Sequence, residues 1–177
     1  MEQTLLRLES LLAEQRNRNL GGEKLHQRLC GFRLLGEVLK QQLVGAWTFV
    51  SSTTKLPDGS PVWGSNPKGL TIFTENGRFV DVIVRSDRAK FASNNRTQGT
   101  AEENKATAQG TISVFGTYTV DEANKSYTVY IEGSSYPNLE GTVQTRPFTI
   151  SGDEFRFTNP APTNGQPVSQ LVFKRAK

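Results

Sequence analysis

The sequence predicts a mainly β protein in which an eight-stranded antiparallel up-and-down β-barrel follows an N-terminal helical arm. From about Leu43 onward, apolar and polar residues alternate with the period of two that is typical of half-buried strands. Turn-forming residues separate these runs at regular intervals, as expected for consecutive hairpins. Composition agrees with this fold class, because Gly occurs 16 times and hydrophobic residues make up only 35% of the 177 residues.

Residues 1–42 form the predicted helical arm, and residues 43–177 form the predicted barrel. Leucines recur at helical spacing in the first half of the arm, and the adjacent glycines Gly21 and Gly22 then end this helix. A second apolar stripe from Leu25 to Leu39 predicts another short helix. Because such short helices are marginal alone, their stripes need a covering surface. We expect the arm either to close the barrel mouth as a lid or to mediate a homodimer.

The barrel segment divides into eight predicted strands, several of them separated by turns such as Glu75-Asn76-Gly77. These strands are Gly45–Thr54, Gly69–Thr74, Arg78–Val84, Thr111–Val120, Lys125–Glu132, Gly141–Ile150, Glu154–Thr158 and Ser169–Arg175. A short helix, Ala101–Gln109 with Thr100 as its cap, is expected within the long polar stretch 85–110. Closing eight strands removes both sheet edges and leaves an interior wide enough for one small ligand. An open sandwich is the alternative architecture.

Several short motifs occur along the predicted barrel segment. Gly45-Ala46-Trp47 resembles the Gly-x-Trp that opens lipocalin barrels, and Lys174-Arg175 stand where lipocalins place an arginine over that tryptophan. A longer run occurs in order: Asn66-Pro67-Lys68-Gly69, Arg85-Ser86-Asp87-Arg88, Phe91-Ala92-Ser93, Phe115-Gly116-Thr117-Tyr118, Glu132-Gly133-Ser134, Tyr136-Pro137-Asn138 and Gln144-Thr145-Arg146. Together these motifs resemble the bacterial and fungal lipocalin-like domain family of small intracellular barrels, over about residues 43–175. This resemblance implies the fold more than a function, and members often carry a His-His pair where this sequence has Val129 and Tyr130.

Alternation along the strands predicts which side chains enter the barrel. With Trp47 inside one end, Phe49, Ser51 and Thr53 should also point inward. The same face of the sixth strand carries Phe148, Arg146 and Gln144, and the last two strands add Phe155, Phe157, Leu171 and Phe173. This interior is apolar at one end and polar toward the other. It suits a pocket with an apolar floor and a few orienting groups near its mouth.

The candidate catalytic residues are Arg146, Glu132, Tyr130 and Tyr118. Arg146 and Glu132 are expected on neighbouring strands facing the lumen, either paired with each other or available to a ligand. The tyrosines would donate hydrogen bonds to a carbonyl, or else pack in the strands. The candidate ligand-binding residues are Trp63, Phe49, Asp81, Arg85, Gln144, Tyr136 and Phe148. For Arg85, a turn network within Arg85-Ser86-Asp87-Arg88 is the alternative.

Several classes of function are not expected. His26, the only histidine, lies in the arm, so the barrel has no Ser-His-Asp or Cys-His site and no zinc cluster. A phosphate loop is also absent, and we expect neither a metal nor a cofactor. The net charge of +4 is spread evenly, which argues against a nucleic-acid partner. Without a signal-like segment or an apolar span, we expect a cytoplasmic protein that does not enter a membrane.

These observations predict a barrel that holds a small, largely hydrophobic molecule. One hypothesis is a cofactor-independent isomerase or cyclase of secondary metabolism, which accelerates a reaction by confining its substrate and polarising a carbonyl. The alternatives are a non-catalytic binding protein and an interaction protein that uses its helical arm. A lid that excludes water would favour the enzyme.

Overall fold

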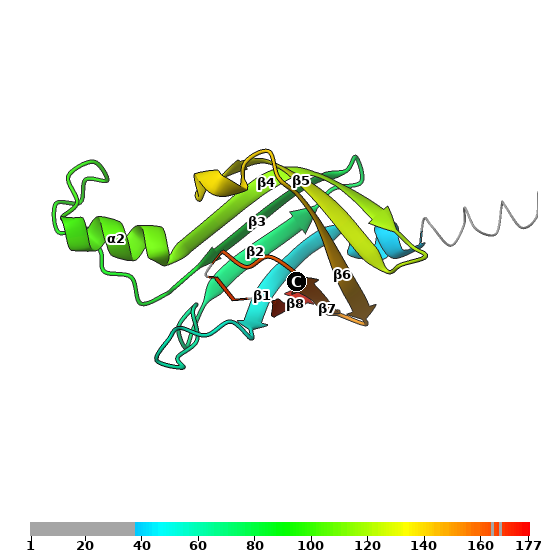
Figure 1. Ribbon diagram of the computed structural model, residues 1–177, viewed down its shortest axis with the longest axis horizontal. Coiled ribbons are helices and arrows are strands. Elements are labelled where there is room, and N and C mark those ends of the chain that lie inside the picture. The colour runs from blue at the N-terminus through cyan, green and yellow to red at the C-terminus, as the bar shows by residue number, and fades with distance from the viewer. Residues whose placement is uncertain (1–37, 164, 167) are drawn as a thin grey trace, which may run out of the picture. The chain divides into compact units, whose positions relative to one another are not determined.

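The computed structural model describes residues 38–163, 165–166 and 168–177 (Figure 1). Residues 39–177 form one compact unit, which holds the barrel. The predicted arm therefore lies almost entirely outside the described residues. Its two possible roles, as a lid or as a dimer contact, stay predictions.

Eight antiparallel strands close into one barrel in the order in which they occur along the chain, which confirms the predicted fold class. The strands are β1 (Gly45–Ser52), β2 (Lys68–Phe73), β3 (Arg78–Val84), β4 (Thr111–Asp121), β5 (Ser126–Ser134), β6 (Val143–Ser151), β7 (Glu154–Asn159) and β8 (Ser169–Arg175). The barrel closes where β1 pairs with β8, with Trp47 opposite Arg175. The expected helix is also present as α2 (Ala101–Gln109), and its N-cap Thr100 forms a capping box with Glu103.

The connections between strands differ sharply at the two ends of the barrel. At one end, the short turns 74–77, 122–125 and 152–153 join consecutive strands. At the other end, the connections are the longer segments 53–67, 85–110, 135–142 and 160–168, which include α2 and the 3-10 helix η1 (Pro137–Leu139). Figure 1 shows α2 and its preceding loop extending beyond this second end. We call the two ends the closed end and the open end.

The closed end is filled by aromatic side chains. Trp47 is fully buried, its ring lies 5.3 Å from that of Phe155, and its Nε1 donates to the carbonyl of Leu43 at 2.8 Å. The guanidinium of Arg175 lies 4.2 Å from the Trp47 ring centroid, which confirms the expected cation–π contact. Residues 38–43 are helical, and the buried Leu43 joins this core. Packing of this kind leaves no room for a ligand.

One expectation for the first strand is wrong. Ser51 and Thr53 were expected inside the barrel, but both are exposed, whereas Ser52 is half-buried and Thr54 is buried. The cause is an irregularity in the pairing of β1 with β8 between Phe49 and Ser51. A bulge adds one residue to one strand, so every later side chain changes face.

Candidate ligand-binding site

The open half of the barrel contains a cavity of about 690 Å³. Its walls come from inward-facing strand residues, and its mouth is bounded by the long connections and α2. The apolar part of the lining includes Ile83, Val114, Phe157 and Leu171 on four different strands. This volume lies within the range of roughly 300–1,000 Å³ that is typical of small-molecule sites.

Arg146 on β6 is the main cationic group inside the barrel. It is only 6% exposed, and its guanidinium lies 5.1 Å from the Phe157 ring and 5.9 Å from the Tyr127 ring. Its Nη2 donates to Gln144 Oε1 at 2.8 Å, and its Nη1 to the Tyr127 hydroxyl at 3.5 Å. Its Nε is buried without a hydrogen-bond partner among the described residues. The Arg146 guanidinium therefore lies where the cavity meets the aromatic core.

Asp81 on β3 is a buried acid that also lines the cavity. Its Oδ1 accepts a hydrogen bond from Thr71 Oγ1 at 2.6 Å. Burial raises the pKa of Asp81, while the Thr71 hydrogen bond and the charge of Arg146 act in the opposite direction. Among the described residues, four ion pairs form within 4.0 Å, and neither Asp81 nor Arg146 takes part in any of them. The two groups therefore face the lumen without a direct ion pair.

Tyr127 is a core residue that contacts Arg146, and it was not among the predicted site residues. Its ring contacts the rings of Phe73, Phe148 and Phe157, while its hydroxyl meets Arg146. Burial raises its pKa to about 12, so the hydroxyl stays neutral at physiological pH. The signal was present in the sequence, because Tyr127 shares one face of β5 with the two apolar residues Val129 and Ile131.

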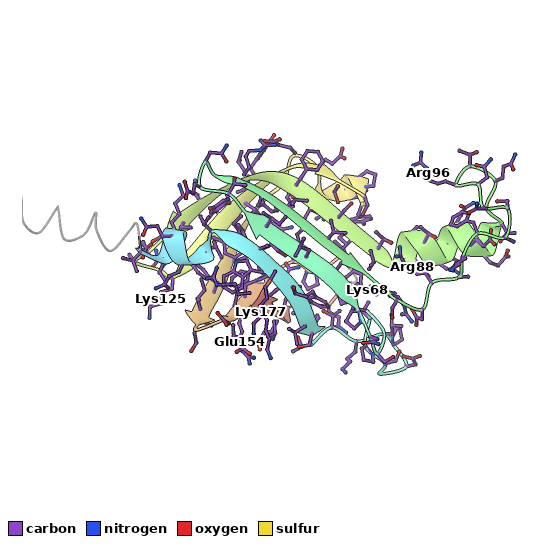
Figure 2. All side chains as sticks on the ribbon, turned by 180° about the vertical axis from the view of Figure 1, so that it is seen from behind. Lys68, Arg88, Arg96, Lys125, Glu154 and Lys177 are labelled. Atoms are coloured by element: carbon purple, nitrogen blue, oxygen red, sulfur yellow. The ribbon has the colours of Figure 1, made fainter. Side chains whose placement is uncertain are left out.

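Loop residues shape the mouth of the cavity. Arg85 makes two hydrogen bonds to the Asp87 carboxylate, at 2.9 and 2.7 Å, and a third to the carbonyl of Val62. Arg88 donates to the carbonyl of Arg85 and to Thr111 Oγ1. Figure 2 shows Arg88 beside α2 and Lys125 at the opposite end of the barrel. These contacts are the turn network that was the alternative interpretation of Arg85, although Arg85 also lines the cavity.

The structure brings together most of the predicted ligand-binding residues. Those that line the cavity are Trp63, Asp81, Arg85, Tyr136 and Gln144. Phe49 and Phe148 are buried as expected, but they belong to the packed core and are not part of the cavity lining. The polar groups Asp81, Gln144 and Arg146 come from the strands, with Arg146 against core rings. The inward positions of β6 pass from Phe148 in the core to Arg146 and Gln144 in the cavity, which is the expected order from apolar to polar, but Arg146 lies against core rings and not at the mouth.

Of the four predicted catalytic residues, only Arg146 lines the cavity. Glu132 faces outward and pairs with Arg78 at 2.6 and 2.8 Å, so its expected pairing with Arg146 is wrong. Tyr130 is 46% exposed on the same outer face, because Val129 and Ile131 take the inward positions of β5. Tyr118 is buried in the core, where its hydroxyl donates to the carbonyl of Thr74. The predicted catalytic set is therefore not assembled in one place.

The described part of the chain contains no group of three or more His, Cys, Asp or Glu side chains arranged to hold a metal ion. Within the same residues, every helix is too short or too polar to cross a membrane. The buried polar side chains described above offer the guanidinium of Arg146, the carboxyl of Asp81, the phenol of Tyr127 and the amide of Gln144, and the cavity lining adds the hydroxyls of Thr54 and Ser169. Together they can donate to and accept from a polar group of a ligand.

The match to a family model agrees with the fold. A family model described as a lipocalin-like domain matches residues 44–176. Among solved structures, a protein described as "REP1-NXSQ fatty acid transporter" is similar over 77% of this chain and 98% of its own, with a TM-score of 0.36 and 12% sequence identity. No curated protein matches the chain significantly.

Proposed function

We propose that this chain, which belongs to the lipocalin-like domain family, binds a small and largely hydrophobic molecule in the cavity at the open end of its barrel. The cavity itself carries this proposal. It is about 690 Å³ in volume, and the inward-facing side chains that surround it are fixed by a closed barrel. A well-formed concave site with apolar walls and a few convergent polar groups is the usual form of a ligand-binding site.

The lining explains why the bound molecule would be mainly apolar. Ile83, Val114 and Leu171 present aliphatic surface from β3, β4 and β8, and the ring of Trp63 adds aromatic surface at the mouth. Transfer of apolar ligand surface from water to such walls gains about 25 cal/mol per Å². The polar groups further inside would then orient the ligand without supplying most of the affinity.

Titration with a neutral apolar fluorophore, N-phenyl-1-naphthylamine, tests this proposal. We expect one saturable site per chain, with enhanced emission. Val114→Trp places an indole in the cavity and should abolish this site. Val143→Trp is the matched control, because Val143 is 64% exposed on the outer face of β6, and it should bind as the wild type does. Lack of binding by the wild type, or equal binding by both variants, would refute the proposal.

The isomerase or cyclase hypothesis needs groups that polarise a carbonyl inside the cavity. Arg146 lines the cavity and is such a group, and the neutral hydroxyl of Tyr127 contacts it from the core, but Glu132, Tyr130 and Tyr118 lie elsewhere. Binding alone is therefore the function we propose, and catalysis by Arg146 stays a prediction. It requires a bound compound whose conversion is lost in Arg146→Gln while its binding persists. A role in secondary metabolism and a cytoplasmic location also stay predictions.

A further inference from the structure

The contacts of Arg146 leave its positive charge without a counter-ion. Its two hydrogen-bond partners, the Gln144 amide and the Tyr127 hydroxyl, are neutral groups. Its Nε is buried without a partner among the described residues, although the side chain lines the cavity. A buried guanidinium destabilises the fold unless an anion pairs with it, because only close pairing with an opposite charge offsets the cost of taking the guanidinium out of water. The Arg146 guanidinium can therefore bind an anion that enters the cavity.

Asp81 does not supply that anion directly. It lies across the lumen on β3, it is held by Thr71 Oγ1, and it makes no ion pair with Arg146 within 4.0 Å. Burial also raises the pKa of Asp81, which favours its neutral, protonated form. A protonated carboxyl presents a hydrogen-bond donor to the lumen and does not repel an incoming anion.

We infer that the ligand is an amphipathic monocarboxylate that enters the barrel head first. Its carboxylate accepts hydrogen bonds from the Arg146 guanidinium, including the Nε–H, and its apolar tail extends toward Trp63 at the mouth. Planar pairing of a guanidinium with a carboxylate is the geometry that best satisfies both groups. This inference rests on the proposed function, because it assigns chemistry to the ligand of the same cavity.

Two ligands that differ only in the head group test the anion. Dodecanoate and 1-dodecanol are each titrated against the protein loaded with N-phenyl-1-naphthylamine. We expect dodecanoate to bind about ten- to a hundredfold more tightly, as for a charge-assisted hydrogen bond to a buried group. Equal affinity would overturn the carboxylate inference and leave the proposed function intact. If neither compound displaces the fluorophore and the fluorophore itself does not bind, the proposed function fails.

Variants of two arginines, one in the cavity and one on the outer face, locate the anion site. Arg146→Gln keeps hydrogen-bond donors but loses the charge, so the preference for dodecanoate over 1-dodecanol should disappear. Arg146→Lys keeps the charge and should retain part of the preference. This variant also provides the test if Arg146→Gln does not fold. Arg78→Gln is the matched control, because it removes a guanidinium on the outer face of the barrel, and it should leave the preference unchanged. A preference for dodecanoate that persists undiminished in Arg146→Gln would overturn the inference.

Brominated ligands test the orientation, because bromine quenches tryptophan emission on contact. A terminal bromine, in 12-bromododecanoic acid, should quench Trp63 more strongly than the bromine of 2-bromododecanoic acid, which would lie beside Arg146. The other tryptophan, Trp47, is buried in the closed end and should be little affected. Trp63→Phe should remove the difference between the two acids. Stronger quenching by the 2-bromo compound would mean that the head group points outward, and would overturn head-first entry.

Discussion

The two ends of the barrel are built from the same eight strands, but one end is packed and the other encloses a cavity. At the closed end, short turns bring the strands together and aromatic rings fill the interior. At the open end, long connections leave a cavity of about 690 Å³. Single strands contain both regions: along β6, the inward positions pass from Phe148 to Arg146 and Gln144. The position of a residue along its strand therefore decides whether its substitution affects stability or binding.

The two ends also differ in whether their buried hydrogen-bond donors have partners. At the closed end, the indole N–H of Trp47 and the hydroxyl of Tyr118 each donate to a backbone carbonyl, so the core contains satisfied groups. In the open half, Arg146 keeps a buried Nε without a partner among the described residues. An unsatisfied buried donor costs about 1–3 kcal/mol, and such a cost persists where a site serves a ligand.

Removal of a large ring at the closed end should have the largest effect on stability. Trp47→Ala should lower the free energy of unfolding by about 3–5 kcal/mol, because the cavity left behind cannot collapse fully. Urea unfolding monitored by circular dichroism measures this change. Trp63→Ala, at the mouth, is the matched control and should cost clearly less, because Trp63 is only half-buried. A Trp47→Ala protein with wild-type stability that no longer binds ligand would contradict the assignment of the two ends.

Protonation of Asp81 should make the free energy of unfolding depend on pH, with an effect of intermediate size. Its pKa is raised above the ordinary value of 3.8, so the folded protein holds a proton where the unfolded chain has lost it. Folding then becomes less favourable as pH rises from about 4 toward the folded-state pKa, and levels off above it. The free energy of unfolding of the wild type, minus that of Asp81→Asn, should therefore fall across this window.

Thr71→Val sharpens the same test. The Thr71 hydrogen bond lowers the pKa of Asp81, so its removal should extend the fall to higher pH. Urea unfolding at a series of pH values measures all three proteins. If the difference between wild type and Asp81→Asn rises with pH, Asp81 is ionised in the folded state and acts as the counter-ion of Arg146. That outcome would also count against a carboxylate ligand.

Substitutions on the outer face of the barrel should change the free energy of unfolding least. The side chains of Arg78 and Glu132 are 46% and 32% exposed, and such ion pairs contribute about 0.2–1 kcal/mol. Glu132→Gln should therefore reduce the free energy of unfolding by no more than this, and the affinity for N-phenyl-1-naphthylamine should not change. A double-mutant cycle with Arg78→Gln separates the pair energy from other effects. Loss of fluorophore binding in Glu132→Gln would place Glu132 in the lumen, contrary to the structure.

The sequence predicted the fold in detail because each strand carries its own alternation and turn. The bounds of β3 and β8 agree with the predicted ones, and Arg175 lies over Trp47 as the motifs implied. Alternation also placed Arg146 and Gln144 inside. Features that depend on pairing between strands were missed. The bulge in β1 reversed the faces of Ser51 and Thr53, and no pattern within β5 shows that Glu132 meets Arg78.

The site was predicted less well than the fold for a related reason. A strand pattern shows that a residue faces inward, but not how deep in the barrel it lies. Phe49 and Phe148 were therefore assigned to the pocket although they pack in the core. Tyr127 was omitted although its position on β5 is an inward one. Depth depends on strand tilt and on the register around the whole barrel.

Methyl resonances in NMR spectra test the central claim, that one half of the barrel binds and the other half only packs. Spectra are recorded with and without saturating N-phenyl-1-naphthylamine. We expect shifts for the methyl groups of Ile83, Val114 and Leu171, which line the cavity, and none beyond small effects for Leu43 and Ile131 in the packed core. Large shifts at Leu43 or Ile131, with no change at Val114, would contradict the account.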